Sequence, residues 1–231
     1  MSTSPAPVAQ GIERRFPKPC VAGSNPAGGA ADNRGRSVAS SEPVIGDDEK
    51  RTATSAAFVV ESGVDVASLL LELYGRVPPL ARDAVEGVDL DRLTEPPSPG
   101  ANPIAWLVWH LTRVQDHHVA DLLGADQVWV GGEWARRFGL DPDPSNTGYG
   151  HSVDEVLAVR PESPEVLLEY LHAVDGRTRS MLEDLVPADL DRIVDRRWDP
   201  PVTLGVRLIS IADDSLQHAG QAAYVRGLLG S

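Results

Sequence analysis

The chain has 231 residues, of which 42% are hydrophobic and 24% are charged, a composition typical of a globular protein with one ordinary domain. Its net charge of −13 argues against nucleic-acid binding, which requires clustered cations. A single cysteine excludes a disulfide framework and a thiolate-rich zinc site. No apolar run approaches the roughly 20 residues that cross a bilayer. We therefore expect a cytoplasmic protein with no membrane segment and no nucleic-acid partner.

Residues 1–56 differ sharply from the rest of the chain. They contain 6 Pro, 6 Gly and 7 Ser without a helical or strand period. Such a segment buries too little apolar surface to offset the entropy of ordering it, so we predict a disordered tail. Residues 5–30 also resemble a peptide translated from a transfer-RNA gene, in which case the natural start codon lies downstream and Cys20 has no chemical role. The alternative is an ordinary disordered tail.

Residues 57–231 are predicted to form the folded domain. Apolar residues spaced by three and four predict a first helix from about residue 64, with a kink at Pro78-Pro79. Asn102-Pro103 is typical of a helix start, and Gly124 of the end of that second helix after Leu123. The stripe of the first helix consists of Leu69, Leu70, Leu73, Val77 and Leu80.

The second half of the chain predicts two more helices. Residues 125–162 are rich in turn signals, so we expect a long ordered loop with one or two short helices. Ser163-Pro164-Glu165 opens a third helix that runs to about Leu185. Residues 192–198 are expected to be extended. Thr203 caps a fourth helix that ends at Leu229. The predicted fold is all-α, a four-helix bundle with one long crossover loop.

The fourth helix combines burial with polarity. Its apolar residues cover most of its circumference, which is typical of a central helix or of one in an oligomer interface. Yet Asp213, Asp214, Gln217 and His218 lie in its middle, and buried polar groups must be paired or ligated. The apolar residues are Leu204, Leu208, Ile211, Ala212, Ala219, Ala222 and Val225.

A small set of residues forms a candidate metal site. Asp214 and His218 are four residues apart and therefore share one helix face, a common spacing for chelating a divalent ion. His110, in the middle of the second helix, can supply a third ligand if the second and fourth helices pack side by side. Two His and one carboxylate with an open position suit zinc or a similar ion. The alternatives are a core histidine bonded to a carbonyl and a plain Asp–His salt bridge.

Four segments carry a resemblance to a known family. Residues 64–229 resemble the DinB-like superfamily, and more narrowly its branch near the mycothiol-dependent maleylpyruvate isomerases and thiol S-transferases. The resemblance implies an up-down-down-up four-helix bundle, usually a homodimer, with a metal held by one His of the second helix and a pair on the last helix. The segments are WLVWHLTRVQDHHVADLLG, NTGYGH, DRRWDPPVTLGVRL and DDSLQHAGQAAYVRGLL.

The resemblance assigns the metal ligands residue by residue. It implies His110, Asp214 and His218 as ligands of zinc, with nickel or manganese as alternatives. Asp214 stands where the family more often has His or Glu, and this departure makes His117, two turns beyond His110, the reserve ligand. Gln221 lies near the metal-bearing face and is a candidate to support a ligand from behind, with inter-helix packing as an equal interpretation.

The implied function is that of an enzyme. A metal-bound thiol is a strong nucleophile at neutral pH, and the resemblance implies mycothiol as cosubstrate for S-transfer to a small electrophile or for isomerisation. Arg113 and Arg226 are candidate substrate-binding residues, although salt bridges explain them as well. Two alternatives stay open: a non-catalytic metal-binding stress protein, and a dimeric scaffold in which Asp214 and His218 are structural.

Overall fold

The computed structural model describes residues 64–230. The predicted disordered tail (residues 1–56) and the segment that resembles a translated transfer-RNA gene (5–30) lie outside these residues, as do residues 57–63 of the predicted folded domain. The described part is mostly helical, as predicted. None of its helices has the length and apolar character needed to cross a membrane.

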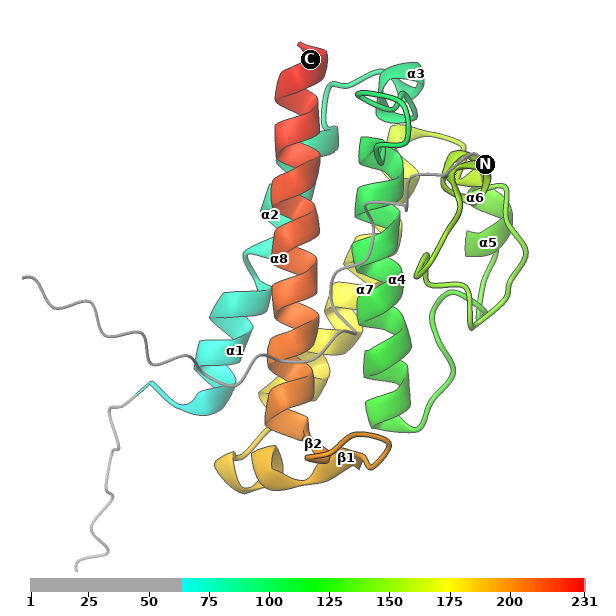
Figure 1. The fold of residues 1–231 in the computed structure, drawn as a ribbon. Coiled ribbons are helices and arrows are strands. Elements are labelled where there is room, and N and C mark those ends of the chain that lie inside the picture. The colour runs from blue at the N-terminus through cyan, green and yellow to red at the C-terminus, as the bar shows by residue number, and fades with distance from the viewer. Residues whose placement is uncertain (1–63, 231) are drawn as a thin grey trace, which may run out of the picture. The chain divides into compact units, whose positions relative to one another are not determined.

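Four helical columns form the bundle, because α1 (Val66–Tyr74) and α2 (Val77–Val85) follow one another as a single broken column. The other three are α4 (Ile104–Leu123), α7 (Pro164–Glu183) and α8 (Leu204–Leu229). Figure 1 shows that the first column runs up, α4 and α7 run down, and α8 runs up. Contacts close the columns into a ring, since α4 packs against α8 and α7, and α2 packs against the same two helices. The predicted bundle is therefore the fold that forms.

The first column breaks earlier than the prolines suggest. The predicted kink at Pro78-Pro79 is wrong in position, because α1 ends at Tyr74 and the chain turns at Gly75. Both prolines lie in the first turn of α2, where a missing N–H costs no helical hydrogen bond. The Tyr74 hydroxyl donates a 2.8 Å hydrogen bond to the carbonyl of Leu208 and thereby ties this break to α8.

Most helix ends follow the sequence signals. Gly124 ends α4 in the left-handed conformation (φ +61°) that glycine adopts without strain. The Thr203 hydroxyl accepts a hydrogen bond from the Val206 N–H and caps α8 as predicted. The start of α4 differs from the prediction, because Pro103 is the cap residue and Asn102 lies before it. α7 starts at Pro164 as expected and ends two residues before Leu185.

Two irregular connections complete the described structure. The crossover from α4 to α7 contains two short helices, α5 (Trp134–Arg137) and α6 (Val153–Ala158), as predicted, and α3 (Leu90–Leu93) precedes α4. The connection from α7 to α8 holds a 3₁₀ helix, Pro187–Asp191, and then a small antiparallel hairpin. The hairpin strands are β1 (Ile193–Asp195) and β2 (Val202–Thr203), so the extended segment predicted for residues 192–198 is confirmed for part of its length.

α8 has both a buried and an exposed side. All seven apolar residues that predicted its burial are buried, and they face the other columns. The opposite side carries exposed apolar residues, so α8 is not a central helix of the described bundle. The homodimer stays a prediction, and this face is where we would place it. Its large exposed apolar residues are Val206, Ile209, Tyr224 and Leu228.

Candidate metal centre

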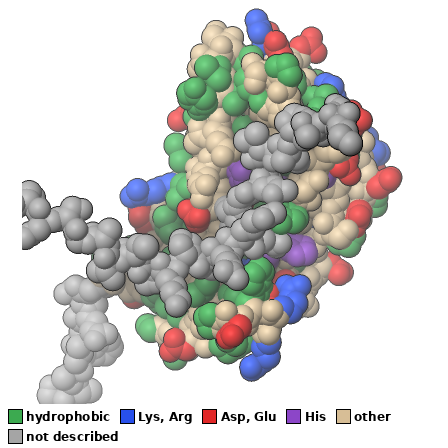
Figure 2. All heavy atoms as spheres, viewed as in Figure 1, with side chains coloured by type: hydrophobic (Ala, Val, Ile, Leu, Met, Phe, Trp, Pro, Cys, Tyr) green, Lys and Arg blue, Asp and Glu red, His purple; other side chains and the backbone are tan. Residues whose placement is uncertain are grey.

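Helices α4 and α8 bring the three predicted ligands together. One donor atom of each of His110, Asp214 and His218 lies within 4.8 Å of the others. The two helices make the most extensive contact in the bundle, and Figure 2 shows histidine side chains on the face where they meet. Asp214 and His218 are neighbours by helical spacing alone, whereas His110 joins them only because α4 packs against α8.

His110 is fixed in one orientation by the crossover loop. Its Nδ1 donates a 2.5 Å hydrogen bond to the carbonyl of Thr147, an oxygen that can only accept. The lone pair is therefore on Nε2, the nitrogen left for a metal. The Trp106 ring stacks on the imidazole with centroids 4.5 Å apart and planes 12° apart. This contact leaves the ring little freedom to turn.

Gly148 lets the loop approach this close. Its φ is +92°, and a Cβ placed there would lie 2.7 Å from His110 Nδ1 and 2.9 Å from a ring carbon of Trp109. Any side chain at this position would push the Thr147 carbonyl away from the imidazole. The glycine is therefore part of what orients His110.

Asp214 and His218 form the other half of the site. His218 Nδ1 is 2.8 Å from Gln221 Oε1, an acceptor, so His218 also presents Nε2. That nitrogen lies 3.6 Å from Asp214 Oδ1. The second carboxylate oxygen of Asp214 is buried and has no hydrogen-bond partner among the described residues. A buried acceptor without a donor is costly in a structural salt bridge but natural in a metal ligand.

The protonation states suit metal binding. Burial lowers the pKa of His110 to about 4, so its imidazole is neutral at pH 7. Burial alone would also lower the pKa of His218, but the neighbouring Asp214 carboxylate, with Gln221, raises it overall. His218 therefore carries a proton more readily than His110, and a bound cation would compete with that proton. Two imidazole nitrogens and one carboxylate are the donor set of a divalent metal with open positions.

His151 is a residue that the sequence did not single out, and it supports the loop over His110. The indole N–H of Trp106 donates to His151 Nδ1 at 3.2 Å. The other ring nitrogen, 2.8 Å from Asn146 Oδ1, donates in turn. These bonds fix the loop on both sides of Thr147. The sequence signal was the pair of glycines in NTGYGH, since Gly148 and Gly150 both have positive φ.

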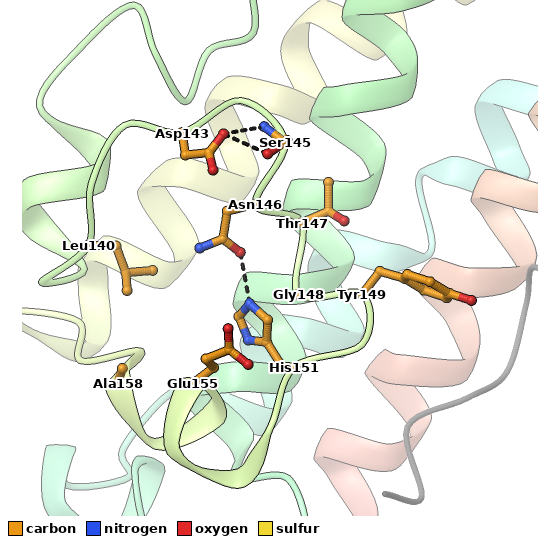
Figure 3. A pocket seen from close by; sticks show the side chains of 10 residues that line it. All are labelled: Leu140, Asp143, Ser145, Asn146, Thr147, Gly148, Tyr149, His151, Glu155 and Ala158. Atoms are coloured by element: carbon orange, nitrogen blue, oxygen red, sulfur yellow. Dashed lines mark hydrogen bonds between the residues drawn. The ribbon is translucent and has the colours of Figure 1, made fainter.

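A pocket opens on the outer side of this loop. It has a volume of about 310 Å³, and Figure 3 shows the side chains of Asn146 and His151 joined at its wall. Tyr149, which is 58% exposed, points away from the pocket toward α8. The pocket therefore shares loop residues with the metal centre without containing the ligands.

Arg113 is placed differently from the prediction. It is fully buried and lies over the Trp129 ring, 4.8 Å from the centroid. All three of its nitrogens are bonded to protein groups, so its guanidinium holds the crossover loop and offers nothing to a substrate. The acceptors are Asp116, Tyr170, Gln127 and the carbonyls of Pro144 and Asn146.

The other predicted residues lie at the edge of the site or outside it. His117 is not in the cluster, and its Nδ1 lies 3.1 Å from the Gln127 amide nitrogen. Arg226 donates to the carbonyl of Asp83 and so joins α8 to α2. Gln221 is where the sequence placed it, behind His218.

Comparison with known proteins gives the class. Residues 73–222 match the DinB superfamily, and the chain belongs to this family. A solved structure of a conserved protein from Enterococcus faecalis superposes with a TM-score of 0.68 at 29% sequence identity. The match covers 73% of this chain and all of that one. No curated protein matches the sequence. The predicted superfamily is confirmed, and the mycothiol-dependent branch stays a prediction.

Proposed function

We propose that the protein is a metal-dependent enzyme that uses a small-molecule thiol, with mycothiol as the expected cosubstrate, for S-transfer to a small electrophile or for isomerisation. His110, Asp214 and His218 would hold a divalent ion, with zinc expected first and nickel or manganese as alternatives. The observation that carries the proposal is the convergence of two imidazole nitrogens and a carboxylate whose second oxygen is buried without a partner among residues 64–230.

The donor set favours a catalytic metal over a structural one. A closed structural zinc site has four protein ligands, whereas three protein ligands leave a position for a small molecule. A divalent ion with such a position lowers the pKa of a thiol that binds it. The protein's own part is to orient both imidazoles so that each presents Nε2 to the ion, through the Thr147 carbonyl and the Gln221 side chain.

The source of sulfur follows from the sequence. The only cysteine is Cys20, and none occurs in residues 64–230, so no described residue offers a thiol. A thiol reaction at this centre therefore needs sulfur from a cosubstrate.

Metal content tests the proposal. The full chain, purified without chelator or affinity histidines, should contain about one equivalent of divalent metal by mass spectrometry. His218→Ala should lose it. His117→Ala is the matched control, because it removes a nearby histidine that is not in the cluster, and it should keep the metal.

The outcomes separate the three candidate functions. Metal near one equivalent together with thiol-dependent turnover of an electrophile supports the enzyme. Metal without such turnover favours the non-catalytic metal-binding protein. Metal far below one equivalent in wild type and both variants, even after reconstitution, would leave a helical scaffold and overturn the proposal.

A further inference from the structure

A second polar cluster lies on the same seam between α4 and α8. Arg207 precedes Asp214 by seven residues, so both lie on one face of α8. His118 follows His110 by eight residues on α4, and because the two helices run in opposite directions it comes to the same level as Arg207. The Nη1 atom of Arg207 is 3.4 Å from both ring nitrogens of His118. The seam therefore has a metal centre at one level and an arginine at the next.

The hairpin before α8 holds Arg207 from the other side. The Nη2 atom of Arg207 donates to Asp195 Oδ2 at 3.1 Å, and Arg197 donates to the same oxygen at 2.8 Å. The Asp195 side chain is only 6% exposed and that of Arg207 only 17%. Burial, and then the charge of Arg207, lower the pKa of His118 to about 3, so this ring is a neutral acceptor. The guanidinium is thus positioned in advance by an imidazole and a carboxylate.

The hydrogen bonds leave part of the Arg207 guanidinium unused. Its Nε–H has no hydrogen-bond partner in residues 64–230, whereas every nitrogen of the buried Arg113 is bonded. Its side chain also keeps a small exposed fraction, unlike that of Arg113, which is zero. An arginine that is fixed but incompletely paired can bind a planar anion by donating two parallel hydrogen bonds.

The local charge favours an anion. Two arginines share one aspartate here, although residues 57–231 carry only 14 Lys and Arg against 28 Asp and Glu. A divalent ion beside Asp214 would add further positive charge to the seam. Figure 2 shows arginine side chains next to histidine on this lower part of the face. An anionic group entering an otherwise acidic domain is therefore attracted to this seam.

We propose that Arg207 binds a carboxylate of the small molecule whose sulfur occupies the metal centre. This inference rests on the proposed function and assigns a specificity residue to it. Seven residues of helix correspond to about 10 Å along the axis, so the carboxylate lies several bonds from the reacting atom. The partly buried Val114 lies between the two levels on α4, four residues from both His110 and His118, and offers an apolar contact for the connecting chain.

A pair of thiols tests this with cobalt(II) in the metal centre. The probes are 6-mercaptohexanoate and 6-mercaptohexanol, which differ in the carboxylate, and binding is followed by the cobalt–thiolate absorption band. The carboxylate should bind about 10- to 100-fold more tightly, as expected for charged hydrogen bonds in a partly buried site. Arg207→Gln should remove this preference and leave the affinity for the alcohol unchanged. Arg92→Gln, on the exposed surface of α3, should retain it.

The outcomes distinguish this inference from the proposed function. Equal affinities of the two thiols for the wild type would overturn the carboxylate site and leave the thiol-binding metal centre standing. A cobalt protein that binds neither thiol would overturn the proposed function.

If the cobalt protein binds neither thiol, a measurement without metal tests the carboxylate site at Arg207. Titration with acetate in place of chloride, at constant ionic strength, should shift the Nε–Hε resonance of Arg207 but not that of Arg92. An unmoved Arg207 resonance would overturn the carboxylate site whatever the metal does.

Discussion

Two buried polar clusters on different sides of α4 each contain one aspartate and differ in how completely that aspartate is paired. On the side facing α7, Arg113 and Asp116 form an ion pair with side chains 0% exposed, and Tyr170 donates to the same carboxylate at 2.7 Å. On the side facing α8, His110 meets Asp214, whose second oxygen has no partner among the described residues. One cluster is closed on itself, and the other leaves a buried carboxylate oxygen without a partner among the described residues.

This difference distinguishes buried polar groups that stabilise the fold from buried polar groups that are candidates for binding a ligand. In the Arg113 cluster the Asp116 carboxylate accepts from the backbone N–H groups of Val128 and Trp129 at 2.9 and 2.8 Å, so it anchors the start of the crossover loop. In the metal centre the same loop instead presents a carbonyl to an imidazole. Fully satisfied buried networks stabilise a single structure, whereas an unsatisfied one is destabilising unless a ligand completes it.

The largest expected effect comes from breaking the closed cluster. Arg113→Met should lower the free energy of unfolding by about 3–5 kcal/mol, because it leaves the Asp116 carboxylate buried without its cation. Urea denaturation followed by circular dichroism measures this change. Arg92→Met, which removes only an exposed ion pair, should cost less than about 1 kcal/mol. A loss as small as that of the control would show that the Arg113 cluster does not hold the loop.

The pH dependence of the metal-free protein between pH 6 and pH 5 should come mainly from two histidines of the α4–α8 seam, His110 and His118. Burial lowers the pKa of His110 to about 4 and that of His118 to about 3, from an ordinary 6.5. Between these values and 6.5 the unfolded chain binds more protons than the folded one, so stability falls as the pH falls. From pH 6 to pH 5 the two histidines together should remove about 2 kcal/mol.

Urea denaturation at the two pH values checks this expectation. His118→Asn should reduce the change by about half, because one of the two titrating groups is gone. The raised pKa of His218 has the opposite sign, since its contribution is lost as the pH rises through that pKa, so it does not act below pH 6. Equal stability at pH 6 and pH 5 would contradict the burial of the two neutral imidazoles.

The smallest effect on stability is expected where the loop meets the metal centre. Gly148→Ala should cost about 1–2 kcal/mol, because alanine is strained at φ +92° and its Cβ would contact His110 Nδ1. The same change should weaken metal binding about tenfold by displacing the Thr147 carbonyl. Metal titration and urea denaturation measure the two effects.

Gly150→Ala is the matched control. Its φ is +73°, yet no atom lies within 4 Å of an added Cβ. Gly150→Ala should lose a similar amount of stability through backbone strain and keep its metal affinity. Equal metal affinities in both variants would show that the loop does not orient His110.

Local patterns predicted the helical part of the fold well. Gly124, Pro164, Thr203 and Gly230 mark helix ends because capping involves only neighbouring backbone groups. The predicted kink is misplaced, because the chain turns at Gly75 and both prolines fit into the first turn of α2. The superfamily resemblance supplied the direction of the columns, which periodicity alone does not contain.

The site prediction is right for the placement of the residue pair on α8 and wrong for Arg113, for a similar reason. The Asp214–His218 pair follows from helical spacing, whereas the roles of arginines depend on what surrounds them. Arg113 and Arg207 are both arginines on apolar helices, yet the first is enclosed by a loop and the second faces a seam. No local pattern distinguishes them, because their partners lie far away in the chain.

By itself the sequence determined where the helices lie and which face of α8 carries Asp214 and His218, since both follow from interactions within a few residues. Tertiary structure alone decided that His110 completes the site and that the Thr147 carbonyl aims it. It also decided which buried carboxylate is satisfied and which is not. Pairing of buried polar groups depends on which helix and loop surfaces meet, and contacts between distant segments settle that.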